Sequence, residues 1–132
     1  MFTALLDANV LVPMALTDTL LRSAEKRLFA PLWSVAILSE VRATLIRVRP
    51  DIPAPRIDMR LLAMNDRFPD AAVHGYESLI DGICLPDKND RHVVAAASLG
   101  RANVIVTANL KVFLQQFCRP SARSHEPQPI PA

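Results

Sequence analysis

A chain of 132 residues is long enough for one compact domain with a real core, but too short for two. Apolar residues make up 51% of the chain, which places it among globular proteins, and its two cysteines exclude a disulfide framework. The formal net charge of +2 allows a polyanionic partner but does not indicate one, because nucleic-acid-binding domains usually carry a larger basic excess.

The N-terminal stretch, residues 2–12, reads FTALLDANVLV and opens with a continuous apolar run. Such a run is typical of a strand buried on both faces of a parallel sheet. The stretch has no basic start like that of an export signal, and Asp7 interrupts it well short of a membrane span. We therefore expect a cytoplasmic protein with no membrane segment.

Two helices are predicted in the first half of the chain. Pro13 suits a first helical turn, and residues 14–29 carry leucines at helical spacing. Residues 30–34, APLWS, indicate a turn or a short extended link, which ends at Ser34 as a plausible N-cap. The apolar stripe of residues 35–48 predicts the second helix.

The second half begins with a proline-rich loop and a predicted helix over residues 56–68. A loop with short extended pieces follows over residues 69–85, and a helix is predicted from Lys88 to Leu99, ended by Gly100. After it, residues 104–107, VIVT, predict a second buried strand, and residues 109–117 predict one or two helical turns.

The alternation of strands and helices predicts an α/β fold in three layers, a central parallel β-sheet flanked by helices. We expect one domain over residues 1–117 and a proline-rich, disordered tail over residues 118–132. In such folds ligands bind beyond the carboxyl ends of the strands, which makes candidates of Asp7, Thr107 and Asn109.

Asp7 places a charge within an apolar stretch. Burial of an unpaired carboxylate is costly, so Asp7 needs a partner such as a metal ion, a base or backbone N–H groups. The alternative is an ordinary N-cap or turn acid. Asn9 is either a turn residue or a hydrogen-bonding partner that fixes the orientation of Asp7.

The other candidate acids lie on predicted helices. Glu40 falls on the flank of an apolar stripe, where it is either a ligand at the sheet edge or a solvated residue near Arg47. Asp87 and Asp90 are three residues apart at a helix start, so their side chains can converge on one turn or simply cap the helix. We expect His92 to be a surface residue of that helix start.

A cluster of acids without His or Cys ligands favours a hard cation, Mg²⁺ or Mn²⁺. Carboxylates brought within about 4 Å of one another repel unless a divalent ion neutralises them. A metal-bound water is a nucleophile suited to phosphoryl chemistry, because the ion also absorbs the charge that develops on the phosphate.

Four segments carry a resemblance to a known family. In this order and spacing, LLDANVLVP, ILSEVRATL, LPDKNDRHVVAAA and NVIVTANLKVF resemble the PIN-domain family, whose bacterial branch includes the VapC-type toxins of toxin–antitoxin pairs. The resemblance runs from Leu5 to Phe113. Residues 17–34 and 68–80 are also similar to one PIN subgroup.

The resemblance implies a Rossmann-like fold and a Mg²⁺- or Mn²⁺-dependent endoribonuclease that cleaves single-stranded RNA, the toxin of a pair with a cognate antitoxin protein. Members of the family commonly dimerise, so the resemblance also makes a homodimer an expected assembly. Carried over position by position, it assigns the catalytic and metal-binding roles to four acids: Asp7, Glu40, Asp87 and Asp90. It assigns supporting roles to Thr107 and Asn109, and Asn9 joins them as the residue whose position suggests a hydrogen bond to Asp7.

RNA would meet a positive rim around this acidic cleft. The candidates for RNA binding are Arg42, Arg47 and Arg91, together with Arg49, Arg101 and Lys111. Each of them is more often plain surface charge than an RNA contact.

Two departures from the family pattern leave a second reading open. Val112 stands where the family carries a fourth acid, and the proline-rich C-terminus differs from that of relatives. The alternative function is therefore a degenerate PIN domain that binds RNA or a protein partner without cleavage. A phosphatase of the haloacid dehalogenase type is a third reading, but its chemistry needs an aspartate where this chain has Asn9.

Overall fold

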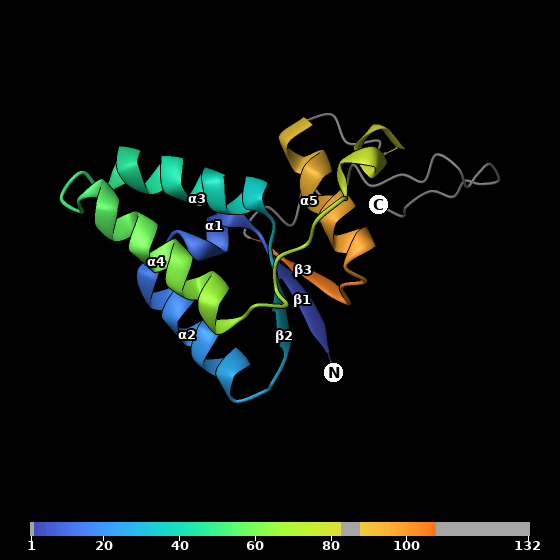
Figure 1. Ribbon diagram of the computed structural model, residues 1–132, viewed down its shortest axis with the longest axis horizontal. Helices are drawn as coiled ribbons and strands as arrows, with labels where there is room; N and C mark the ends of the chain where they lie inside the picture. Colours follow the sequence, from blue (N-terminus) through green and yellow to red (C-terminus); the bar gives the residue numbers. More distant parts are fainter. Residues whose placement is uncertain (1, 83–87, 108–132) are drawn as a thin grey trace.

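The computed structural model describes residues 2–82 and 88–107, with only the backbone of residues 88–90 (Figure 1). Within these residues the sheet has three parallel strands in the order β2-β1-β3. β1 (Thr3–Leu6) lies in the middle, between β2 (Ala30–Leu32) and β3 (Val104–Val106). The predicted parallel sheet is confirmed.

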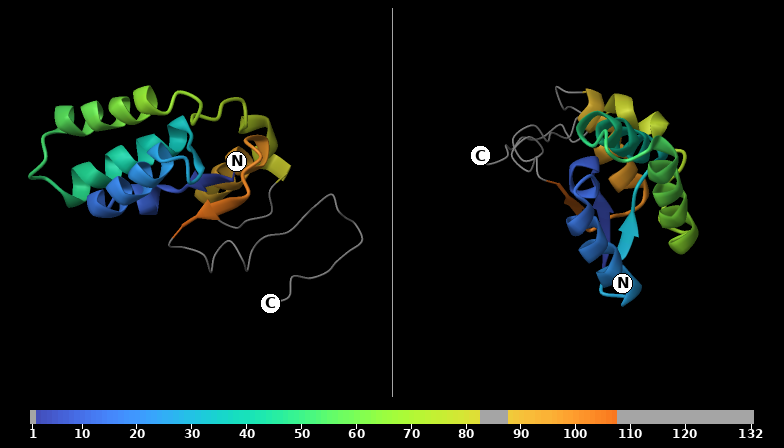
Figure 2. Two further views of the ribbon diagram at one scale, coloured as in Figure 1. Left: turned by 90° about the horizontal axis from the view of Figure 1, so that it is seen from below. Right: turned by 90° about the vertical axis from the view of Figure 1, so that its left-hand side faces the viewer.

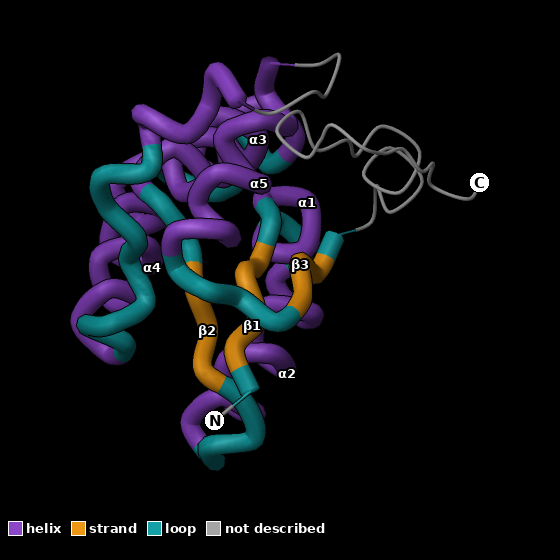
Figure 3. The backbone as a smooth tube through the Cα atoms, turned by 90° about the vertical axis from the view of Figure 1, so that its right-hand side faces the viewer, coloured by secondary structure: helices purple, strands orange, loops and turns teal. Residues whose placement is uncertain are grey.

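Helices cover both faces of this sheet. α5 (Lys88–Leu99) and the 3₁₀ helix η1 (Glu77–Gly82) lie on one face, as Figures 1 and 3 show. The remaining helices lie on the other: α1 (Ala8–Leu11), α2 (Met14–Glu25), α3 (Val35–Val48) and α4 (Ala54–Arg67). The predicted α/β architecture of a sheet between helical layers is therefore also confirmed.

β1 is buried because it has a strand on each side and helices above and below. Ala4, Leu5 and Leu6 are all buried, and the register places Leu5 between Leu32 and Ile105. This explains why the segment reads as an uninterrupted apolar run, the pattern of a strand covered on both faces.

The first element is shorter than its apolar run predicts. β1 ends at Leu6, and α1 begins at Ala8, with Asp7 between them as the N-cap. An apolar run cannot by itself distinguish a buried strand from a buried helix, so the change of structure at Asp7 is invisible to periodicity.

β2 forms where the sequence left a choice between a turn and an extended link. The strand continues into Trp33, whose N–H donates to the Ala71 carbonyl at 2.9 Å and whose carbonyl accepts the Val73 N–H at 2.8 Å. The loop after α4 thus lies along the outer edge of the sheet, and its pairing at Ala72 is one of the short extended pieces predicted for residues 69–85. The prediction is wrong for residues 77–82, which form the 3₁₀ helix η1.

α2 ends before its predicted boundary. Its last residue is Glu25, and Arg27 has a left-handed backbone with φ 63°. Such a conformation ends a helix, so Leu28 leaves the apolar stripe and is 67% exposed.

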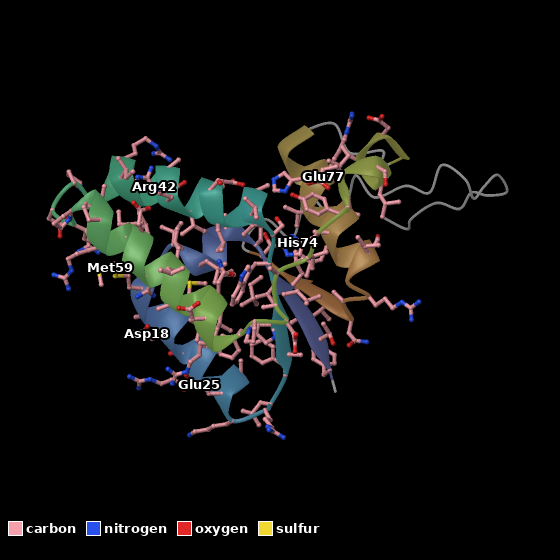
Figure 4. The ribbon with its side chains drawn as sticks, in the orientation of Figure 1. Asp18, Glu25, Arg42, Met59, His74 and Glu77 are labelled. Carbon is pink, nitrogen blue, oxygen red and sulfur yellow. The ribbon has the colours of Figure 1, made fainter. Side chains whose placement is uncertain are left out.

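α3 and α4 form an antiparallel hairpin (Figure 2). The Trp33 indole N–H donates to the side-chain oxygen of Asn65 at 2.8 Å, and its ring meets Phe68 edge-on. α4 is also ion-paired to Asp18 and Glu25 of α2, which Figure 4 labels.

Within the described ranges, no helix is both long and apolar enough to cross a membrane.

Parts of the predicted organisation lie outside the described residues. These are the helical turns predicted for residues 109–117 and the proline-rich tail predicted for residues 118–132. The boundary at residue 117 accordingly stays a prediction.

Candidate functional site

The parallel strands bring three chain segments to one edge of the sheet. Asp7 follows β1 directly, Thr107 follows β3, and Ser34 follows β2 after Trp33. Ser34 is fully buried and its hydroxyl accepts the Ile37 N–H at 3.1 Å, so it caps α3 and sets where that helix begins. The carboxyl edge of the sheet therefore positions Asp7, Thr107 and the start of the helix that carries Glu40.

Asp7 is held at this edge from two directions. Its side chain is nearly enclosed, at 6% exposure of the residue. Oδ1 accepts the Ala8 N–H at 2.7 Å, and Oδ2 accepts the Thr107 hydroxyl at 2.9 Å. The backbone N–H of Asp7 also donates to the Val106 carbonyl at 3.1 Å, so its position is fixed by both β3 and α1.

Thr107 and Asn9 form a short chain of hydrogen bonds behind Asp7. The Asn9 amide nitrogen lies 3.2 Å from Thr107 Oγ1, and Asn9 Oδ1 lies 3.3 Å from the same atom. A threonine hydroxyl has one proton, and the shortest of its contacts is with Asp7. Asn9 then donates to Thr107, which donates to Asp7, so Asn9 orients the carboxylate through the threonine.

No ion pair within the described part of the chain joins Asp7 to a Lys, Arg or His side chain. Two hydrogen bonds from neutral donors offset part of the cost of burying its charge. A carboxylate oxygen can accept a further bond besides the one it already has. The carboxylate of Asp7 and the oxygens of Asn9 and Thr107 are hard donors, the type that Mg²⁺ and Mn²⁺ select.

Glu40 reaches from α3 toward α5. Its Oε1 lies 3.7 Å from Nε2 of His92, with side-chain exposures of 49% for Glu40 and 15% for His92. The expectation that His92 is a surface residue is wrong. α5 contacts both the sheet and η1, and residues 93–97 are all buried, so His92 directly precedes an enclosed stretch of the helix.

The N-terminal end of α5 therefore lies against α3 at Glu40. Asp90 belongs to the first turn of α5, and it precedes His92 by two residues, about 3 Å along the helix axis. Asp87, Asn109 and Val112 lie outside the described residues. Among the side chains that are described, no three Asp, Glu, His or Cys residues form a group that could hold a metal ion.

The three arginines predicted to bind RNA lie at different positions on two helices, α3 and α5. Arg91 is half-buried in the first turns of α5, next to Asp90. Arg47 is exposed in the last turn of α3. Arg42 follows Glu40 by two residues, which is about 200° around the helix, and it forms a two-bond ion pair with Asp58 of α4.

The ion pair with Asp58 shifts the pKa of both groups, and Figure 4 labels Arg42 on α3. The hydrogen bond from Arg42 and, to a smaller degree, its charge hold the pKa of Asp58 below its usual value. The same pair raises the pKa of Arg42. Arg42 thus joins α3 to α4, and its contact with RNA stays a prediction.

A family model described as a PIN domain matches residues 3–111. The chain belongs to the PIN-domain family. No curated protein and no solved structure gives a significant match. PIN domains are generally nucleases and usually use divalent metal ions, which agrees with the oxygen donors around Asp7.

The matched region includes every predicted acid and supporting residue and ends one residue before Val112. Of the predicted set, the structure brings Asp7, Asn9 and Thr107 into contact, and it places Glu40 against the helix that carries Asp90. His92 was missed because a single histidine carries no ligand spacing. The available signal was its place two residues after Asp90, inside a helix whose following residues are small and apolar.

Proposed function

We propose that this PIN domain is a Mg²⁺- or Mn²⁺-dependent endoribonuclease that cleaves single-stranded RNA. The observation that carries the proposal is the carboxylate of Asp7, buried at the carboxyl end of the central strand without a cationic partner among the described residues. A divalent ion is the partner that makes such a buried charge favourable.

Asp7, Glu40, Asp87 and Asp90 are the proposed metal ligands. Once bound, the ion supplies a water of lowered pKa and neutralises charge on the phosphate. Thr107 and the Ala8 N–H fix the two oxygens of Asp7, so that the carboxylate needs no reorientation when the ion arrives. Asn9 and Asn109 are proposed to support this arrangement.

An acidic site needs basic groups nearby to admit a polyanion. Arg91 is the best placed of the candidates, because it lies in the same turn of α5 as Asp90 and His92. Single-stranded RNA is the proposed substrate since its phosphates and unpaired bases can enter a site at a sheet edge. Arg42 and Arg47 would contact RNA only beyond this edge, along α3.

We further propose that the chain is the toxin of a toxin–antitoxin pair, with a cognate antitoxin protein as partner, and that it acts in the cytoplasm. The support is the resemblance of its four motifs to the VapC-type branch. Expression of the chain should then stop cell growth, and the Asp7→Asn variant should not. Gel filtration would show whether the chain is the homodimer that this resemblance suggests.

The direct test is cleavage of a fluorescently labelled single-stranded RNA. Cleavage should require Mg²⁺ or Mn²⁺, stop in EDTA, and fall on the order of 100-fold or more in Asp7→Asn. Asp70→Asn is the matched control, because Asp70 is an exposed loop residue and its loss should leave the rate unchanged. Equal rates for Asp7→Asn and the wild type would refute the assignment.

The second candidate is a PIN domain that binds RNA or a protein partner without cutting. The observation that favours it is Val112 in place of the family's fourth acid. Calorimetric titration with Mg²⁺ separates the two functions. Tight RNA binding without measurable Mg²⁺ binding would favour the non-cleaving domain.

A further inference from the structure

We infer that His92 is a positioning residue that holds the Glu40 carboxylate at the carboxyl edge of the sheet. This inference rests on the proposed function in one respect, the role of Glu40 as a metal ligand. It adds a residue that neither the motifs nor the family membership assigns.

The contact joins two elements that are far apart in the sequence. Nε2 of His92, on α5, lies 3.7 Å from Oε1 of Glu40, on α3. α3 begins at the end of β2, whereas α5 leads into β3. His92 therefore fixes Glu40 relative to the same helix turn that contains Asp90.

The burial of the two side chains shows which one positions the other. The His92 side chain is 15% exposed, and the residues that follow it, Val93 and Val94, are buried. The Glu40 side chain is 49% exposed and has three rotatable bonds. The enclosed ring is thus the fixed partner, and the flexible carboxylate is the one whose freedom the contact restricts.

The chemistry of the contact fits this role. Nε2 and Oε1 lie 3.7 Å apart, within ion-pair distance but slightly beyond hydrogen-bond length, so a small rotation of the flexible Glu40 side chain is enough to form the bond. A carboxylate only accepts hydrogen bonds, and Nε2 can present a proton to it in one neutral tautomer as well as in the charged imidazolium. A carboxylate can accept about four bonds in total, so the imidazole does not prevent Glu40 from binding an ion. Side chains that orient metal ligands in this way commonly change metal affinity about 10–100-fold when removed.

The experiment compares His92→Gln with His92→Asn. Glutamine places its amide nitrogen near the position of Nε2, whereas asparagine has the same amide but stops one methylene short. Mn²⁺ affinity is measured by calorimetry, and kcat and KM are measured on single-stranded RNA. We expect His92→Asn to weaken Mn²⁺ binding about tenfold, and His92→Gln to restore most of that loss.

Two controls separate positioning from general damage. His74→Asn changes an exposed histidine of the loop before η1, labelled in Figure 4, and should leave the Mn²⁺ affinity unchanged. In a Glu40→Ala background, His92→Asn and His92→Gln should bind Mn²⁺ equally, because the carboxylate on which His92 acts is gone. Thermal denaturation of each variant confirms that it is folded.

Equal Mn²⁺ affinity for His92→Gln and His92→Asn would overturn the inference, as would a difference that persists in the Glu40→Ala background. This failure is distinct from failure of the proposed function. If the chain cleaves RNA but positions 40 and 92 are not coupled, only the role of His92 is refuted. If the two positions are coupled but the chain does not cleave RNA, only the ribonuclease function is refuted. A wild-type chain that does not bind Mn²⁺ contradicts both.

Discussion

The hydrogen bond from Thr107 to Asp7 can be removed with almost no change of shape. Valine has nearly the same volume as threonine but carries a methyl group in place of the hydroxyl. Thr107→Val therefore takes away the donor that lies 2.9 Å from Asp7 Oδ2 and leaves the Ala8 N–H, at 2.7 Å from Oδ1, in place. Asp7 is buried, so water replaces the missing donor only in part.

The loss of folding stability expected for Thr107→Val follows from the charge of the acceptor, the Asp7 carboxylate. A hydrogen bond to a charged group contributes about 1.5–3 kcal/mol, and the Thr107–Asp7 bond is only partly buried, which favours a value of about 2 kcal/mol. For a domain of this size that loss lowers the melting temperature by about 6–10 °C. Thr107→Ser keeps the hydroxyl and loses one methyl group, a cost of about 0.8 kcal/mol at most.

The assay is urea unfolding of the wild type, Thr107→Val and Thr107→Ser, without metal and with saturating Mn²⁺. Without metal, the valine variant should be the least stable of the three. With Mn²⁺, its deficit should grow, because Thr107 fixes the carboxylate that binds the ion, so the valine variant binds Mn²⁺ less tightly and gains less stability from it. The reasoning is refuted if Thr107→Val is as stable as Thr107→Ser in the absence of metal.

Two further predictions concern stability. Gly100→Ala should destabilise the fold by about 1–3 kcal/mol in urea unfolding, because a Cβ atom there would lie 2.7 Å from Leu32 Cδ1; an unchanged midpoint would contradict the close packing. The pKa of Asp58 is lowered in the folded state, so its pair with Arg42 stabilises the fold above the ordinary pKa of 3.8 and is lost as the pH falls below that value. Asp58→Asn should therefore be less stable than the wild type at pH 7, and the difference should shrink progressively as the pH falls below 3.8, whereas a difference that does not change with pH would count against the pair.

The sequence predicts those elements whose ends carry local chemical signals. The predicted bounds of α3 and α5 agree with the structure, since Ser34 caps one helix and Gly100 ends the other. β1 and β3 form at the predicted apolar runs, and β1 is covered on both faces as expected. The prediction that β3 is buried is wrong for the described residues, because β3 lies beside β1 on one side only and its Val104 is 41% exposed. The special role of Asp7 is also predictable from the sequence, because a charge within an apolar run is costly to bury unless it has a partner.

The features that the sequence does not predict depend on contacts between distant residues. β2 is three residues long and contains Pro31, so neither its length nor its composition distinguishes it from a link. Its pairing with β1 and with the loop at Ala72 makes it a strand. The role of His92 likewise depends on its contact with Glu40, which lies more than fifty residues earlier and on another helix.

The central claim is that carboxylates from β1, α3 and α5 gather around one divalent cation at the carboxyl edge of the sheet. The most direct measurement is an anomalous difference map from a crystal soaked in Mn²⁺. We predict one strong peak within about 2.5 Å of carboxylate oxygens from Asp7, Glu40 and Asp90. A Mn²⁺-saturated crystal with no peak beside Asp7, or with these three carboxylates on separate surfaces, would contradict the account.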